Sequence, residues 1–199
     1  MDYKTYTEQY LSETVMIAHI IDQSEIVAAI QILSGLRKTR GRLFILGVGG
    51  SAANASHAVN DFRKLAGIEA YAPTDNVSEL TARINDQGWS SSYRKWLEGS
   101  RISFNDALLV LSVGGGSETT SPNLVEATGL AASKRAKIVA IVSRDGGYAK
   151  SRAHACVLVP VMNNDRITPH AEGWQGVVLH LIVNAIADEI ANESKKRLL

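Results

Sequence analysis

The sequence predicts an α/β fold in which a parallel sheet is covered by helices on both faces. From residue 42 onward, short and nearly continuous apolar runs alternate with segments whose apolar residues repeat at helical spacing. Strands of a parallel sheet are buried on both faces and therefore read as unbroken apolar runs. The chain has 199 residues, of which 45% are hydrophobic and 21% charged, and this composition is typical of a single globular domain.

Two helices are predicted before the first strand, over residues 3–39. The segments YLSETVMIAHIIDQ and SEIVAAIQILSGLRKT carry apolar residues at helical spacing. Ser24 is a candidate N-cap for the second of these helices. We expect the N-terminal helices, residues 1–40, to pack on the rest of a single domain that covers residues 1–199, or on a neighbouring subunit.

Five apolar runs then predict the strands of the sheet. In chain order they are RLFILGV, the weaker IEAYAP, DALLVLSV, KIVAIVS and CVLVPV. The fourth run leads into SRDGGY, whose Gly146 and Gly147 are expected to form only a turn. A long helix over about 171–196 closes the chain. In such sheets ligands bind at the carboxyl ends of the strands, so the candidate functional residues are those that follow them.

Charge and composition exclude several classes of partner. The formal net charge is +1, so no broad attraction to nucleic acid or to a membrane surface is expected. No apolar run is long enough to span a bilayer, and MDYKTYTEQY lacks the basic-then-apolar pattern of a signal peptide. Cys156 is the single cysteine, which excludes an intramolecular disulfide. We expect a cytoplasmic protein that acts on a small molecule.

The stretch LFILGVGGSAANASHAVNDF predicts a strand, a tight anion-binding turn and a helix. Gly47, Gly49 and Gly50 let the backbone approach an anion, and the helix N-terminus offers it unpaired N–H groups. GVGGSA formally fits the dinucleotide pattern G-x-G-x-x-A, but a plain strand-to-helix turn fits equally well. A dinucleotide site also needs an acidic residue after the next strand, and Glu69 and Asp75 are poorly placed for that role.

A second glycine-serine turn between a strand and a helix strengthens the prediction of an anion site. VLSVGGGSETTSPNLVEA runs from a strand through Gly114, Gly115 and Gly116 to a helix that starts near Pro122. The hydroxyl groups in this stretch belong to Ser112, Ser117, Thr119, Thr120 and Ser121. Hydroxyls and backbone N–H groups at two neighbouring strand ends suit a compact phosphomonoester. The chain lacks G-x-x-x-x-G-K-[ST], which argues against nucleoside triphosphate chemistry.

Two pairs of titratable residues could perform chemistry near these turns. His57 and Asp61 lie four apart on the predicted helix after the first turn and so share a face. Glu172 and His180 lie eight apart on the closing helix and roughly share a face. Two imidazoles and two carboxylates could bind a first-row metal, zinc above all, or act as a general acid/base set. Taken alone, His180 also fits a core histidine and Asp61 a surface carboxylate.

In the order and spacing of these motifs, the sequence resembles the sugar isomerase (SIS) domain family, and within it the phosphoheptose isomerases. The resemblance covers nearly the whole chain, through two leading helices and the motifs GVGGSAANASHAVNDF, INDQGW, LVLSVGGGS, SPNLVEA, IVAIVSRDGG, VLVPV, DRI and VVLHLIV. It implies a three-layer αβα sandwich around a five-stranded parallel sheet, in a homotetramer with active sites between subunits. It also implies conversion of sedoheptulose 7-phosphate to D-glycero-D-manno-heptose 7-phosphate.

The resemblance assigns roles to individual positions. Substrate-binding serines and aspartates of the family are matched by Ser51, Ser112, Ser117, Asp86 and Asp165. Its zinc-binding positions are matched by His57, Asp61, Glu172 and His180. Its acid/base pair is matched by Asp61 and His180.

Several departures set this chain apart from the family pattern. Val48 replaces the polar residue of the usual Gly-Asn-Gly-Gly-Ser turn, and residues 112–117 read Ser-Val-Gly-Gly-Gly-Ser instead of Ser-Thr-Ser-Gly-Asn-Ser. Asp61 stands where the family has Glu, Glu172 stands where it has Gln, and ETTS and TPHA are insertions. The leading hypothesis is a metal-assisted aldose–ketose isomerase of a sugar phosphate. The alternative is a non-catalytic regulator or adaptor, which the lost polar residues favour and the retained metal-capable side chains oppose.

Overall fold

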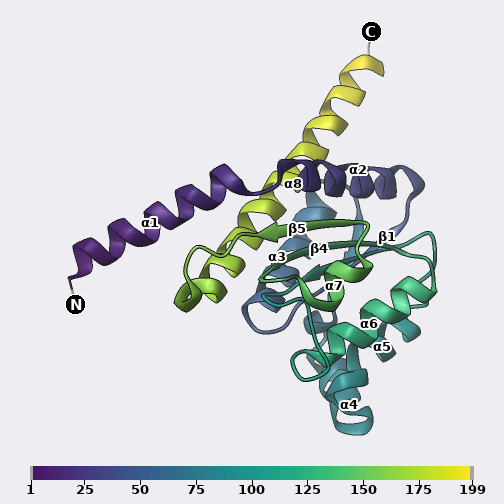
Figure 1. Cartoon of the computed structure of the whole chain (residues 1–199). Helices are drawn as coiled ribbons and strands as arrows, with labels where there is room; N and C mark the ends of the chain where they lie inside the picture. Colours follow the sequence, from purple (N-terminus) through teal and green to yellow (C-terminus); the bar gives the residue numbers. More distant parts are fainter. Residues whose placement is uncertain (1, 198–199) are drawn as a thin grey trace.

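Five parallel strands form the central layer of the molecule, in the spatial order β2-β1-β3-β4-β5 (Figure 1). The strands are β1 (Arg42–Leu46), β2 (Glu69–Tyr71), β3 (Ala107–Leu111), β4 (Lys137–Ser143) and β5 (Ala155–Val159). The computed structural model describes residues 2–197. Each predicted apolar run contains one strand, so the predicted three-layer αβα fold with a five-stranded parallel sheet is confirmed.

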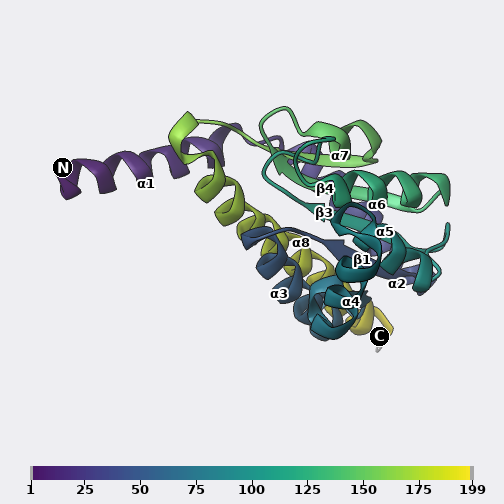
Figure 2. The ribbon, with the colours of Figure 1, turned by 90° about the horizontal axis from the view of Figure 1, so that it is seen from below.

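Helices cover both faces of this sheet. The flanking helices are α2 (Gln23–Thr39), α3 (Gly50–Lys64), α5 (Trp89–Gly99), α6 (Pro122–Ser133), α7 (Gly147–Arg152) and α8 (Ile167–Arg197). Leu43 and Ile45 of β1 pack in one apolar cluster with residues of α2, α3 and α8, whereas Phe44 and Leu46 pack with α5, α6 and α7. This alternation follows from the two-residue period of a strand. Figure 2 shows α3 and α8 on one side of the strands and α6 and α7 on the other.

The first helix, α1 (Tyr3–Ile20), extends away from the body of the molecule (Figure 1). Glu13 and Ile17 are its buried residues. Glu13 accepts hydrogen bonds from Arg166 at 2.7 and 2.9 Å and lies 2.8 Å from His170, which ties α1 to the start of α8. Among the described residues no single helix is long and apolar enough to cross a membrane; α1 and α2 pass that test only as a pair bent by 69°.

Two helix starts differ from the prediction. Asp22, and not Ser24, caps α2, because the Asp22 carboxylate accepts a hydrogen bond from the Ser24 backbone N–H at 2.8 Å. The closing helix begins at Ile167 rather than near residue 171. Its first turn accommodates Pro169, since backbone N–H groups have no helical partner there. The insertion TPHA therefore extends α8 at its start.

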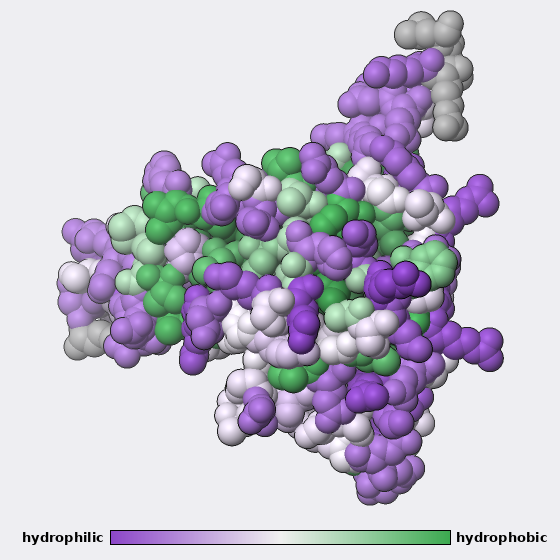
Figure 3. Space-filling view, turned by 45° about the vertical axis from the view of Figure 1, so that its right-hand side comes forward, coloured by the Kyte–Doolittle hydropathy of each residue, from purple (hydrophilic) through white to green (hydrophobic). Residues whose placement is uncertain are grey.

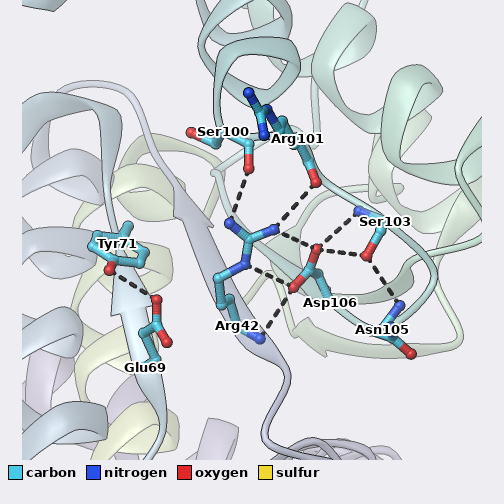
Figure 4. Close-up of polar contacts among 8 residues, drawn as sticks. All are labelled: Arg42, Glu69, Tyr71, Ser100, Arg101, Ser103, Asn105 and Asp106. Atoms are coloured by element: carbon cyan, nitrogen blue, oxygen red, sulfur yellow. Dashed lines mark hydrogen bonds and ion pairs between the residues drawn. The ribbon is translucent and has the colours of Figure 1, made fainter.

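The amino ends of β1 and β3 are joined by an ion pair (Figure 4). Arg42 donates to Asp106 through Nη2 at 2.9 Å and through Nε at 3.0 Å, and it also donates to the carbonyl oxygens of Ser100 and Arg101. Burial alone would raise the pKa of Asp106, but hydrogen bonds from Arg42 and Ser103 lower it overall. The pair holds the loop before β3 against β1, at the end of the sheet opposite the two glycine-serine turns.

Strand order brings those two turns side by side. Leu46 at the end of β1 pairs with Val110 of β3, so the segments that follow the two strands begin next to each other. The chain runs from β1 to β2 on one side of β1, and β3 lies on the other side. Such a reversal opens a crevice at the carboxyl ends of the strands, which is the usual ligand position in open parallel sheets. The remaining elements are η1 (Pro73–Asp75), α4 (Val77–Gln87) and η2 (Asn164–Arg166).

Candidate active site

A pocket of about 280 Å³ lies between the two glycine-serine turns. Five of the predicted phosphate-binding residues line it: Ser51, Ser112, Ser117, Thr120 and Ser121. The lining is completed by Val48, Val113, Gly114, Gly116, Arg144 and Asp145. Hydroxyl groups, glycine backbone and a guanidinium together form a set suited to a small anion.

The first turn is shaped by glycines and held by a tyrosine. A Cβ on Gly47 would lie 2.2 Å from the carbonyl oxygen of Ser51, so only glycine fits at that position. Gly49 has φ +63° and caps α3 without a side-chain hydrogen bond. Tyr93 of α5 is buried, and its hydroxyl donates to the carbonyl oxygen of Gly47 at 2.7 Å. The turn is therefore braced from the opposite face of the sheet.

The second turn is fixed by hydrogen bonds within itself and with the β4–α7 turn. Ser112 Oγ accepts from the Gly115 N–H at 3.0 Å, and Ser117 Oγ accepts from the Thr120 N–H at 3.0 Å. Gly115 has φ +72°, and a Cβ there would lie 1.9 Å from the carbonyl oxygen of Gly146. Gly146 and Gly147 thus form the expected turn, and that turn packs against the glycine loop that lines the anion pocket.

His57, Asp61 and His180 come together beside the same end of the sheet. Asp61 Oδ2 lies 3.2 Å from His57 Nε2 and 3.5 Å from His180 Nδ1. The two imidazole rings meet edge to face with centroids 5.1 Å apart. Asn60 donates to Asp61 Oδ1 at 3.0 Å, so Oδ2 is the oxygen that faces both imidazoles. The first two residues lie on α3 and the third lies on α8, and these helices pack against each other.

The donor set of this cluster fits a divalent first-row metal. One ligand atom from each of the three side chains lies within 4.8 Å of the other two. Imidazole nitrogen and carboxylate oxygen are zinc ligands, and three protein ligands leave a position open for water or substrate. The Asp61 side chain is 12% exposed, whereas those of His57 and His180 are 53% and 55% exposed. A ligand could therefore approach the cluster from the imidazole side.

Glu172, the fourth predicted metal ligand, is not brought into this cluster. Its carboxylate lies beside Gly50, where a Cβ would be 2.3 Å from Oε2. Gly50 is the first residue of α3, and a negative charge at a helix N-terminus is favoured by the helix dipole. The Glu172 backbone carbonyl also accepts from Asn54 of α3 at 2.9 Å. The structure therefore shows a cluster of three residues where the sequence predicts four.

Three predicted substrate-binding residues do not line the pocket. Asp86 lies on α4, where it accepts a hydrogen bond from Asn85 and is exposed. Asp165 lies in η2 and is also exposed. Thr119 is exposed at the tip of the second turn, with its hydroxyl 3.4 Å from that of Ser117. Thr119 thus lies next to the pocket without lining it, whereas Asp86 and Asp165 have no contact with the pocket residues in the described chain.

The sequence prediction missed Arg144 and Asp145 as pocket residues. Both follow β4 and line the pocket. The available signal was SRDGGY, which ends a strand at the same edge of the sheet as the other two turns. The two glycines of this stretch predict a turn, and the two charged residues just before them line the anion pocket.

Comparisons with known proteins agree with this architecture. The family model described as "SIS domain" matches residues 7–143. The phosphoheptose isomerase of Citrifermentans bemidjiense is 29% identical over 175 residues, covering 85% of this chain and 86% of the relative. The structure of phosphoheptose isomerase from Neisseria gonorrhoeae superposes with a TM-score of 0.79 at 23% identity, covering 92% of this chain and 98% of the other.

The fold also occurs in a protein that is not named an isomerase. The Vibrio vulnificus NanR protein, complexed with ManNAc-6P, superposes with a TM-score of 0.67 at 13% identity, covering 96% of this chain and 64% of the other. At such low identity the likeness concerns the fold alone. The family match spans the N-terminal helices, the first four strands and both glycine-serine turns. This chain belongs to the SIS domain family.

Proposed function

We propose that the chain is a metal-assisted aldose–ketose isomerase of a sugar phosphate, with sedoheptulose 7-phosphate as the leading substrate. Similarity to phosphoheptose isomerases over most of both chains indicates an isomerase. The observation that carries the substrate class is the placement of two sites along α3. Ser51 at its start lines the anion pocket, and His57 begins the three-residue cluster about 9 Å further along the helix axis. An extended sugar phosphate can reach from one to the other.

The pocket would hold the phosphate and orient the sugar. Hydroxyls of Ser51 and of the second turn would donate hydrogen bonds to the phosphate oxygens. Holding the far end of the substrate converts the proton transfers into reactions between positioned groups. We therefore assign the pocket to substrate binding and orientation, and the chemistry to the cluster.

His180 and Asp61 would move the protons. The reaction removes a proton from C1 of the ketose, gives an enediol, and returns a proton to C2, while the proton on O1 is lost and O2 gains one. His180 Nδ1 faces Asp61, and its Nε2 has no hydrogen-bond partner among the described residues. The largely exposed ring is therefore free to exchange protons with a bound sugar, and the buried Asp61 holds it in orientation.

A divalent ion would be held by His57, Asp61 and His180, with zinc favoured by this donor set. When bound, it would act as a Lewis acid that polarises the sugar carbonyl. Chelation followed by readdition of zinc tests this part of the proposal. Activity on sedoheptulose 7-phosphate should be lost and then restored. Full activity in the presence of chelator would contradict the requirement for a metal. If the zinc-loaded protein converted no sugar phosphate, the proposed isomerase activity would be contradicted.

We also propose that copies of the chain assemble, with tetramers as the leading form and active sites between subunits. Exposed apolar side chains occupy α1, namely Leu11, Val15, Met16 and Ile20, and Figure 3 shows hydrophobic residues on α1 and where it joins the body. Val177 and Leu181 of α8 flank His180 and are 50% and 44% exposed. Light scattering should give a mass near four chains, and Val15→Glu should lower it. A monomeric wild type would contradict the assembly.

The alternative is a regulator that binds a sugar phosphate without converting it. Val48 and Val113 line the pocket as apolar residues, which weakens the polar lining expected of an enzyme. Binding of a sugar phosphate with no proton exchange in the zinc-loaded protein would favour this alternative over the isomerase.

A further inference from the structure

We infer that Arg144 is a phosphate-binding residue, which contacts the substrate dianion from the β4–α7 turn. This inference rests on the proposed function and extends it by one residue. Arg144 is the one cationic side chain that lines the anion pocket in the described chain. The other polar lining residues are serines, a threonine and Asp145, so without Arg144 the pocket would contain no positive side chain to balance a phosphate.

The backbone directs Arg144 toward the pocket from a fixed point. Ser143, the last residue of β4, donates from its N–H to Val113 O at 3.0 Å and from its hydroxyl to Val159 O at 2.8 Å. Arg144 follows with φ 55°, a left-handed conformation that a side chain other than glycine adopts at some cost. Such conformations persist where the surrounding structure determines them.

Gly114 provides the space over which the arginine lies. A Cβ on Gly114 would meet Arg144 Cδ at 3.9 Å, so the aliphatic part of the arginine runs alongside the glycine loop. A larger residue at 114 would extend into the path of this side chain. Gly114 and Gly116 stand where the family pattern has polar side chains, and the glycine at 114 leaves space for the Arg144 side chain.

The charges around Arg144 leave it available for a ligand. Arg144 is exposed and forms no ion pair among the described residues. Its neighbour Asp145 is engaged with its own turn, because Oδ1 accepts from the Gly147 N–H at 3.1 Å. A guanidinium can bind two phosphate oxygens at once, which an uncharged hydroxyl cannot match in strength. Arg144 would therefore favour phosphorylated sugars over free sugars.

Inorganic phosphate is the probe that separates this inference from the proposed reaction. Its dissociation constant can be measured by calorimetry on the full chain, without any turnover. Arg144→Asn removes the charge, and asparagine tolerates the left-handed conformation. Loss of a charged hydrogen-bond donor should weaken phosphate binding by about 10- to 100-fold. Arg144→Lys should retain part of the affinity because it keeps the charge.

Arg135 supplies the matched control. It is an exposed arginine with φ 59°, and it precedes β4 at the opposite end of the strand. Arg135→Asn should leave phosphate affinity unchanged, and melting temperatures of both variants would verify folding. Equal phosphate affinity of Arg144→Asn and wild type would overturn the inference even if the chain is an active isomerase. Weakened binding by Arg144→Asn would support it even if sedoheptulose 7-phosphate is not the substrate.

Discussion

The hydroxyl of Tyr93 donates a hydrogen bond to the backbone carbonyl oxygen of Gly47 at 2.7 Å, between two buried residues that are 46 apart in the chain. The bond links α5, on one face of the sheet, to the turn that leads into α3 on the other face. Burial raises the pKa of Tyr93 to about 12, so the hydroxyl keeps its proton at any pH near neutrality. The geometry of the anion pocket thus depends on a residue that does not line it.

Replacing Tyr93 by Phe should loosen the first turn. The Gly47 carbonyl would lose its buried donor, at a cost of about 1–3 kcal/mol in the free energy of unfolding. Because the turn carries Ser51, KM for the sugar phosphate should rise more than kcat falls. Tyr71→Phe is the control, because this variant loses a tyrosine hydrogen bond to Glu69 that is exposed to solvent. Unchanged stability and KM in Tyr93→Phe would show that the bond does not brace the pocket.

Replacing Asp61 by Asn should abolish most of the turnover while the fold survives. Asn has a similar shape but neither accepts a proton nor carries the charge that draws a metal. A lost acid/base or ligand group should lower kcat by roughly 10²- to 10⁴-fold. Zinc content measured by atomic absorption should fall as well. Asp188→Asn, an exposed carboxylate on α8, changes the net charge equally and should retain both activity and zinc. Near-normal turnover in Asp61→Asn would remove Asp61 from the mechanism.

Replacing Gly50 by Ala should displace Glu172 from the start of α3. The new Cβ would lie 2.3 Å from Oε2, and the carboxylate is at the free end of a flexible side chain. Loss of a favourable charge at the helix N-terminus should cost about 0.3–1 kcal/mol in the free energy of unfolding. In a Glu172→Ala background the same glycine substitution should cost less. Additive effects in this double-mutant cycle would show that the two residues do not interact.

A pH dependence should follow from the Glu13 contact. A hydrogen bond from Arg166 is the largest cause that lowers the pKa of Glu13, and burial opposes it. Hydrogen bonds with His170 and Asn163 lower the pKa further, so that it falls from an ordinary 4.5 to about 2. A lowered folded-state pKa contributes stability that is present above pH 4.5 and is lost as the pH falls toward 2. At pH values above 4.5, the melting temperature of Glu13→Gln should therefore lie furthest below that of the wild type.

Melting temperatures from pH 2 to pH 7 would measure this difference between wild type and Glu13→Gln. The gap should narrow as the pH falls, because protonated Glu13 resembles Gln. Glu8→Gln, on an exposed position of the same helix, should show no such trend. A gap that stays constant over the whole range would mean that Glu13 acts by packing rather than by charge.

The fold could be predicted because its signals are local. An unbroken apolar run such as residues 107–111 is buried at every position in β3, and Pro122 begins α6 as its fixed φ favours. Even the weak run at 68–73 contains a strand, although only three of its residues pair there, at one edge of the sheet. The convergence of the two glycine-serine turns follows in turn from parallel strand order.

Side-chain positions at the site could not be predicted in the same way. Glu172 and His180 both lie on α8, but Glu172 lies beside Gly50 at the start of α3, whereas His180 lies beside Asp61 further along that helix. This placement depends on how α3 packs against α8, which the spacing of residues within one helix does not reveal. Arg144 was missed for a similar reason, since its approach to Gly114 joins two turns that are remote in sequence. Local patterns locate the edge of the sheet but do not show which side chains meet there.

Proton exchange at the substrate tests the central claim most directly. The zinc-loaded protein would be incubated with sedoheptulose 7-phosphate in heavy water and followed by NMR. An enediol mechanism at His180 and Asp61 predicts deuterium at C1 of the ketose and at C2 of a newly formed aldose phosphate. If neither this sugar nor a panel of other ketose and aldose phosphates takes up deuterium, the chain is no isomerase, and sugar-phosphate binding without turnover becomes its function.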